Sequence, residues 1–272
     1  MHGKNRGAYE AVLHTDLDGT LDHFSSDQLI KLIFDEFCAW PPFAVQRPYI
    51  EQRIKQVYAS SGSAEEVKKF AYDLSRRFVD TGMKIDFMRE SIGRGVDKWR
   101  AIDDIHYFFE EKLRSLAVLP KWNSGEFGDA LHCVNNKYQL TLGTRYSTEV
   151  NYNPSTRKIT AVIPTVLRMK MSHIVRDLKR AGCLPGRFVF IGDTPQEEPY
   201  AAQMASLAIW LSDKADLRLS KAKTNLKIPE AKTEGLSILL PHIENFLQQP
   251  LGNRPNNNPE RQKCLIGEIY KQ

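Results

Sequence analysis

Short apolar segments alternate with amphipathic segments along much of the chain, and this alternation restricts the possible folds more than any other feature. The segments that we expect to be strands are AYEAVLHT (8–15), KYQLTLGT (137–144), RFVFIGDT (187–194) and AIWLS (208–212). VNYNPSTRKITAVIPT (150–165) is expected to form a short hairpin or a strand with a loop. The expected helices are FGDALHCVNN (127–136), MSHIVRDLKRAG (171–182), EEPYAAQMASLA (197–208) and GLSILLPHIENFL (235–247). The alternation predicts an α/β fold with a doubly wound parallel sheet, whose active sites lie at the carboxyl ends of strands.

Residues 23–120 follow a different pattern, with helical spacing throughout and no clear strand. Three amphipathic segments carry it: SSDQLIKLIFDEFCAW (25–40), SAEEVKKFAYDLSRRFVD (63–80) and VDKWRAIDDIHYFFEEKLRSL (96–116). Their aromatic residues stand at core spacing, which favours a role in packing over ring binding. We therefore predict a catalytic core formed by 1–22 and 121–249, a helical domain over 23–120, and a flexible Asn- and Pro-rich tail over 250–272.

Composition excludes several classes of protein. Hydrophobic residues make up 42% of the chain, and no apolar run approaches the roughly 20 residues that span a bilayer. The amino terminus lacks the features of a secretory signal, and the four cysteines are far apart, which predicts reduced thiols in a cytoplasmic protein. A net charge of +5 is too mild to indicate nucleic acid. The basic segment 214–232 is expected to be a solvated loop rather than a surface that binds anions.

Several polar and charged residues stand at the ends of the predicted strands or at the start of a predicted helix. Asp16 and Asp18 come directly after the first strand, Thr144 and Asp193 lie at the ends of two others, and Lys170 precedes a helix. Carboxylates crowded at one edge of a sheet repel one another, and a divalent cation offsets that cost. Mg²⁺ takes a few carboxylates, several waters and phosphate oxygens, so the set indicates phosphoryl transfer.

Four segments, in this order, resemble the motifs of the haloacid dehalogenase superfamily. They are AVLHTDLDGTL, YQLTLGT, RMKMSHIV and FVFIGDTPQEE, and the resemblance extends from about residue 8 to 211 in order and spacing. The resemblance implies a Rossmann-like core with an α-helical cap domain over 23–120. It also implies a Mg²⁺-dependent phosphatase. Asp16 would be the nucleophile that forms an aspartyl-phosphate, and Asp18 the general acid and base.

The resemblance implies roles for the remaining residues as well. Thr144 would bind the phosphoryl oxygens, and Lys170 would orient the nucleophile and offset negative charge. The metal ligands would be Asp16, the backbone carbonyl of Asp18, Asp193 and Glu197. Two assignments stay open: Thr141 lies in the same predicted strand as Thr144, and the fourth motif has Glu197 and Glu198 where an aspartate is commoner.

The residues before the nucleophile, His14 and Thr15, also depart from the family pattern, which is more often apolar or aromatic. The histidines lack metal spacing, so we expect most of them to be structural. His14 is the hardest to dismiss, because a regular strand would point it to the same side as Asp16.

Within this chemistry the sequence leaves the substrate open. A large cap favours small phosphorylated metabolites, whereas phosphotyrosine on a protein would need an open cap. A phosphomutase would use the same groups, and a catalytically silent binding protein is the alternative outside enzymes. Activity on an aryl phosphate that EDTA and Asp16→Asn abolish separates the enzyme from the binding protein.

Overall fold

The computed structural model describes residues 10–23, 29–59, 64–164, 188–193, 195, 205–222 and 224–249 of the 272 in the chain. The predicted helix over 171–182, most of the predicted helix over 197–208 and the predicted tail over 250–272 lie outside these residues. So do two predicted site residues, Lys170 and Glu197. No helix in the described part of the chain is both long enough and apolar enough to cross a bilayer.

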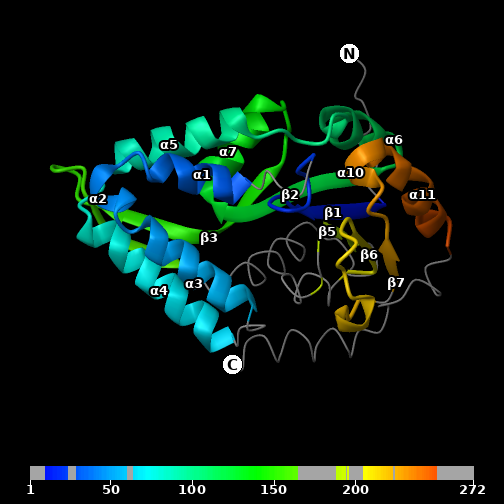
Figure 1. Cartoon of the computed structure of the whole chain (residues 1–272). Helices are drawn as coiled ribbons and strands as arrows, with labels where there is room; N and C mark the ends of the chain where they lie inside the picture. The colour runs from blue at the N-terminus through cyan, green and yellow to red at the C-terminus, as the bar shows by residue number, and fades with distance from the viewer. Residues whose placement is uncertain are drawn as a thin grey trace, which may run out of the picture.

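The described strands form one sheet of seven in the order β4-β3-β2-β1-β5-β6-β7 (Figure 1). Their bounds are Ala11–Asp16 (β1), Val118–Phe127 (β2), Gly143–Tyr152 (β3), Ile159–Pro164 (β4), Phe188–Gly192 (β5), Leu207–Trp210 (β6) and Thr224–Lys227 (β7). All neighbouring pairs are parallel except β3 and β4, which form the predicted hairpin. Its turn is closed by Asn153 Oδ1, which accepts from Ser155 N and Thr156 N at 2.9 Å each. The predicted α/β class is therefore confirmed.

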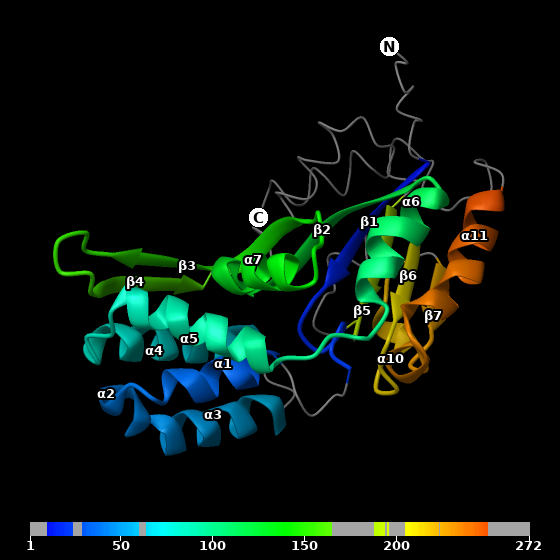
Figure 2. The ribbon, with the colours of Figure 1, turned by 90° about the horizontal axis from the view of Figure 1, so that it is seen from above.

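The described helices fall into two groups, which are in contact with each other (Figure 2). The first group is α1 (Leu29–Phe37), α2 (Pro41–Ala44), α3 (Arg47–Ala59), α4 (Ala64–Asp80) and α5 (Ile85–Lys98), which lie together beside the projecting β3–β4 hairpin. The second is the π-helix η1 (Tyr107–Lys112), α6 (Leu113–Ser115), α7 (Gly128–Lys137), the 3₁₀ helices η3 (Leu217–Leu219) and η4 (Leu236–Leu239), α10 (Ala231–Glu234) and α11 (Leu240–Gln248). The predicted boundary at residue 120 stays a prediction, but η1 and α6 lie near η4 and α11, with the sheet.

Side chains alternate along the central strands and supply two apolar layers. Leu13, Val189 and Ile191 belong to a cluster that includes the buried face of α11. Val12 and Phe190, one residue out of phase, belong to a second cluster on the opposite face of the sheet. Because both faces of β1 and β5 are buried, their apolar runs continue without alternation, which is typical of central parallel strands.

One predicted strand is wrong, and a strand that was not predicted takes its place. Most of KYQLTLGT is not a strand, because Tyr138 caps α7, Gln139 has φ +54°, and β3 begins only at Gly143. The unpredicted strand is β2, in the centre of the sheet, although it contains Pro120. Proline is normally absent from central strands except at bulges, and the β1–β2 register shifts at this position.

Candidate active site

The loop after β1 brings two predicted aspartates to the carboxyl edge of the sheet. Asp16 is the last residue of β1 and is buried, whereas Asp18 is half-buried and accepts a hydrogen bond from Ile30 N at 3.2 Å. Between Leu17 and Leu21 the chain forms a tight turn, with Leu21 N donating to Leu17 O at 3.0 Å. This turn directs both carboxyl groups to the same edge of the sheet.

Gly19 is required in this turn for two reasons. Its φ of +74° is in the left-handed region, and a Cβ at this position would lie 2.9 Å from Asp193 Oδ2. The amide of Gly19 donates to Asp22 Oδ2 at 2.5 Å, so a third carboxylate closes the turn from inside. The Asp-Gly pair that suggests an ordinary surface turn is therefore packed directly against another acidic residue.

Asp193 comes next to Asp16 through strand pairing. The neighbouring strands β1 and β5 are parallel, with Thr15 opposite Ile191, so the residues that follow them share one edge of the sheet. Asp193 is buried there. The structure thus brings together Asp16, Asp18 and Asp193, three of the six predicted site residues.

Both carboxylate oxygens of Asp16 accept hydrogen bonds from hydroxyl groups. Ser124 Oγ donates to Oδ1 at 3.1 Å, and Thr20 Oγ1 donates to Oδ2 at 3.4 Å. Ser124 is fully buried near the end of β2 and was not among the predicted site residues. A usable signal was present in the sequence, because an apolar run precedes Asn-Ser-Gly and a helix follows it.

The bulge in β2 determines which residue stands opposite Asp16. Leu13 pairs with Pro120, but His14 pairs with Trp122, so the pairing skips Lys121. If the pairing did not skip Lys121, Asn123 would face Asp16 in place of Ser124. Bulges near active sites commonly redirect a side chain in this way.

The structure does not place Thr144 next to Asp16. Thr144 is in β3, opposite Asn123 of β2, and β2 separates β3 from β1. Two strand spacings amount to about 10 Å, which is beyond the reach of a threonine side chain. The prediction of Thr144 as a neighbour of the nucleophile is corrected: Ser124 has that position.

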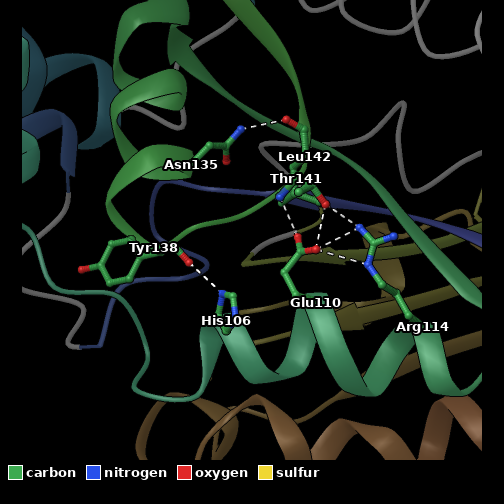
Figure 3. Close-up of polar contacts among 7 residues, drawn as sticks. All are labelled: His106, Glu110, Arg114, Asn135, Tyr138, Thr141 and Leu142. Atoms are coloured by element: carbon green, nitrogen blue, oxygen red, sulfur yellow. Dashed lines mark hydrogen bonds and ion pairs between the residues drawn. The ribbon is translucent and has the colours of Figure 1, made fainter.

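The alternative residue, Thr141, is also directed elsewhere (Figure 3). Its hydroxyl donates to Glu110 Oε2 at 2.7 Å and its amide to Oε1 at 2.6 Å, and Arg114 contacts the same hydroxyl. Glu110 and Arg114 belong to η1 and α6, so these contacts attach the segment before β3 to that helix. Thr141 therefore contributes to structure.

Negative charge accumulates in the loop and changes how its groups ionise. Burial, followed by the nearby Asp22 carboxylate, raises the pKa of Asp18 to about 7. Burial also raises the pKa of Asp22 to about 6, although the hydrogen bond from Trp99 Nε1 opposes this increase. Asp18 therefore retains its proton to a higher pH than an ordinary aspartate.

A lysine that was assigned to a solvated loop lies against this acidic cluster. Lys232, on α10, donates from Nζ to the carbonyl oxygen of Gly19. Burial lowers its pKa, whereas Asp22, Asp193 and Asp18 act in the opposite direction. The predicted loop over 214–232 is wrong where the segment forms η3, β7 and the start of α10, although Lys214 and Lys227 are exposed as expected. Lys232 is the exception, and its contact spans 213 residues.

Two carboxylates and one carbonyl are available for a cation: Asp16, Asp193 and the backbone oxygen of Asp18. In the part of the chain that the structure describes, no three His, Cys, Asp or Glu side chains form a metal-binding group by themselves. Mg²⁺ needs only one or two carboxylates when waters and phosphate oxygens complete its shell. Asp193 and Asp22 both raise the pKa of Asp18, which reveals an excess of negative charge that a cation would offset. The donor set therefore fits magnesium.

No protein-family model matches the sequence, and no curated protein matches it. Several solved structures resemble the fold. A phosphoserine phosphatase solved as a phospho-aspartyl intermediate analogue has a TM-score of 0.59 at 16% identity, covering 86% of this chain and 99% of that chain. A HAD family hydrolase from Salmonella enterica subsp. enterica serovar Typhi has a TM-score of 0.55 at 13% identity, over 92% and 73% of the two chains. Cytosolic 5′-nucleotidase IIIB bound to cytidine has a TM-score of 0.54 at 13% identity, over 97% and 89%. At these identities the likeness shows the fold alone.

Proposed function

We propose that this chain, which has the haloacid dehalogenase fold, is a magnesium-dependent phosphatase that hydrolyses phosphomonoesters through an aspartyl-phosphate. One observation carries the proposal: Asp16 is buried and hydrogen-bonded at the sheet edge beside Asp193, with the raised-pKa carboxyl of Asp18 two residues away. The fold alone would not support an activity, because one fold hosts many functions.

Asp16 is suited to attack phosphorus. Ser124 and Thr20 hold its two oxygens in place, so little reorganisation is needed before an oxygen forms the new bond to phosphorus. The ester oxygen–phosphorus bond breaks as this bond forms, and the leaving alkoxide needs a proton. A nucleophile fixed by two hydroxyl groups fits a covalent mechanism.

Asp18 is suited to supply that proton and later to remove one. With a pKa of about 7, a substantial fraction carries a proton at neutral pH, so the carboxylic acid can protonate the leaving alkoxide. The resulting carboxylate then accepts a proton from the water that attacks the phosphorus of the aspartyl-phosphate. This second step releases inorganic phosphate and restores Asp16 as a carboxylate.

Magnesium would be held by the Asp16 and Asp193 carboxylates and the carbonyl of Asp18. When bound, it neutralises the phosphoryl oxygens and the crowded carboxylates. Ser124 gives its hydroxyl proton to Asp16, so it holds the nucleophile and does not take the phosphoryl-binding role first assigned to Thr144. Lys170 and Glu197, outside the described residues, keep their predicted roles as the charge-neutralising cation and an additional acidic ligand of the metal or its waters.

We favour a small phosphorylated metabolite as the substrate. The support is the helical domain α1–α5, which is inserted between β1 and β2 and is large enough to act as a cap over the loop that follows β1. The structural neighbours named for phosphoserine and for a nucleotide are consistent with this class. Phosphotyrosine on a protein is the alternative substrate, and transfer to a second hydroxyl would make the enzyme a phosphomutase.

The test is a panel of phosphate esters assayed with Mg²⁺ and with EDTA. It contains an aryl phosphate, phosphoserine, nucleoside monophosphates, sugar phosphates and a phosphotyrosine peptide. We expect hydrolysis of the small esters that needs Mg²⁺ and is abolished by Asp16→Asn. The matched control is Asp213→Asn, the same change at an exposed position, which should leave turnover unaltered.

Three outcomes would contradict the proposal. Hydrolysis that persists in EDTA would show that the reaction needs no metal ion. Hydrolysis that survives Asp16→Asn would show that Asp16 forms no covalent intermediate. A wild-type protein that turns over no ester would favour the binding protein. Preference for the phosphotyrosine peptide would change only the substrate class.

A further inference from the structure

His14 occupies a position where an apolar residue would be the simpler choice. It lies on β1, is buried, and is surrounded by aromatic rings on the sheet face that carries Val12. Its ring stacks on Phe190 with centroids 5.7 Å apart, meets Phe188 edge-on at 6.5 Å and lies 6.4 Å from Trp122. Burial of a polar ring in this setting costs free energy unless the ring makes a hydrogen bond.

The hydrogen bond that His14 makes leads directly to the proposed nucleophile. His14 Nε2 is 3.0 Å from Ser124 Oγ, and Ser124 Oγ donates to Asp16 Oδ1 at 3.1 Å. β1 is regular from Ala11 to Asp16, so His14 and Asp16 share one face and the serine connects them. All three residues are buried.

The direction of this chain follows from the number of protons available. A carboxylate only accepts hydrogen bonds, so Ser124 must give its single hydroxyl proton to Asp16. The hydroxyl oxygen can then only accept from His14, which requires a proton on Nε2. The order is His14 Nε2–H to Ser124 Oγ–H to Asp16 Oδ1.

We propose that His14 is a positioning residue that keeps the Ser124 hydroxyl proton directed toward the reacting carboxylate. The inference rests on the proposed phosphatase function and extends it by one residue. Without the donor at Nε2, the Ser124 hydroxyl loses one of these two partners and is held by Asp16 alone, so its orientation is less firmly fixed. Preorganised donors are effective because they need no reorientation during the reaction.

The test compares steady-state kinetics of single and double variants on the best small ester, with Mg²⁺. His14→Leu removes the donor, and we expect kcat to fall about tenfold, the equivalent of one hydrogen bond, with KM nearly unchanged. His14→Gln keeps an N–H near the position of Nε2 and should recover most of that loss. In a Ser124→Ala background, His14→Leu should have no further effect, because the residue through which it acts is gone.

Val12→Ala is the matched control for packing. Val12 is buried on the same face of the same strand, but its apolar side chain takes no part in the hydrogen-bonded chain. We expect it to lower the melting temperature, as His14→Leu does, without the fall in kcat. Equal loss of kcat in Val12→Ala, or losses that multiply in the double variant, would overturn the proposal.

A readout that does not need turnover separates this inference from the proposed function. Nitrogen-15 NMR of the imidazole should show the proton on Nε2 in the wild type, and the Nε2 resonance should move in Ser124→Ala. A proton on Nδ1 alone would overturn the positioning role even in an active enzyme. An inactive wild type with the expected resonance would refute the phosphatase but support the hydrogen-bonded chain.

Discussion

The loop from Asp16 to Asp22 and the interior of the helical domain are both buried, but they are built from opposite chemistry. The loop contributes three carboxyl groups, and Asp193 adds a fourth. The interior around Phe37 consists of aromatic rings: Phe43 and Phe78 stack with centroids 4.7 Å apart, and Phe78 meets Phe37 edge-on at 5.3 Å. Aromatic pairs of this kind stabilise a fold, whereas crowded carboxylates oppose it.

The difference shows that the aromatic interior of the helical domain stabilises the fold, whereas the acidic loop lowers its stability. The loop is held by directed hydrogen bonds, such as Gly19 N to Asp22 Oδ2, and its charges remain only partly offset by Lys232. In the helical domain the buried carboxylate of Glu36 is paired with both Lys98 and Arg94. Substitutions in the two regions should therefore have opposite consequences for stability and for turnover.

The largest effect is expected from Asp18→Asn. Loss of the proposed general acid and base should lower kcat by roughly 10²–10⁴-fold. The folded-state pKa of about 7 exceeds the ordinary value of 3.8, so ionised Asp18 opposes folding at pH 8. The variant should therefore melt at a higher temperature than the wild type in magnesium-free buffer at pH 8. A lower melting temperature would show that the loop is not under electrostatic strain.

Phe78→Ala tests the aromatic interior of the helical domain. Removal of the ring that contacts both Phe37 and Phe43 should lower the free energy of unfolding by about 3–5 kcal/mol. Denaturant unfolding measures this, and kcat of the folded protein at low temperature should stay within a few-fold of the wild type. Phe78→Leu, which keeps most of the volume, serves as the milder control. A fall in kcat of the folded variant well beyond a few-fold would indicate that the helical domain takes part in the reaction.

Trp99→Phe examines the contact that joins the two regions. Trp99, the residue that caps α5, donates from Nε1 to the buried Asp22 carboxylate, next to the backbone pairing of Asp22 with Ala101. The substitution should lower the free energy of unfolding by about 1.5–3 kcal/mol when Asp22 is ionised. Since the pKa of Asp22 is about 6, the loss should be larger at pH 8 than at pH 5. Equal losses at both pH values would mean that packing dominates.

The smallest effect is the dependence of stability on pH and magnesium. Asp18 and Asp22 have folded pKa values of about 7 and about 6, both above 3.8, so the folded protein binds more protons than the unfolded chain between about pH 4 and 7. Their contribution to stability therefore falls as pH rises through this window. Calorimetry should show that Mg²⁺ raises the melting temperature by a few degrees at pH 8 and by less at pH 5.5. The same increase at both values would contradict a cation at these carboxylates.

Much of the fold could be predicted from local patterns. β1, β5, β6, the β3–β4 hairpin and the helices α1, α7 and α11 lie where apolar runs, turn residues and helical spacing indicate them. Asp16, Asp18 and Asp193 were identified for the same reason, because each follows a buried strand. β2 was missed, since Pro120, Asn123 and Gly125 have low strand propensity and only the bulge and the central position make the strand possible.

The sequence by itself determined which residues carry the negative charge and at which strand ends they stand. Only the tertiary structure decided which groups surround them. Ser124 replaces Thr144 because β2 lies between β3 and β1, and a bulge in β2 brings Ser124 opposite Asp16. Lys232 reaches Gly19 across 213 positions. Strand ends and helix faces follow from interactions between near neighbours in the chain. Register and long-range contacts depend on how distant segments pack, which no local pattern specifies.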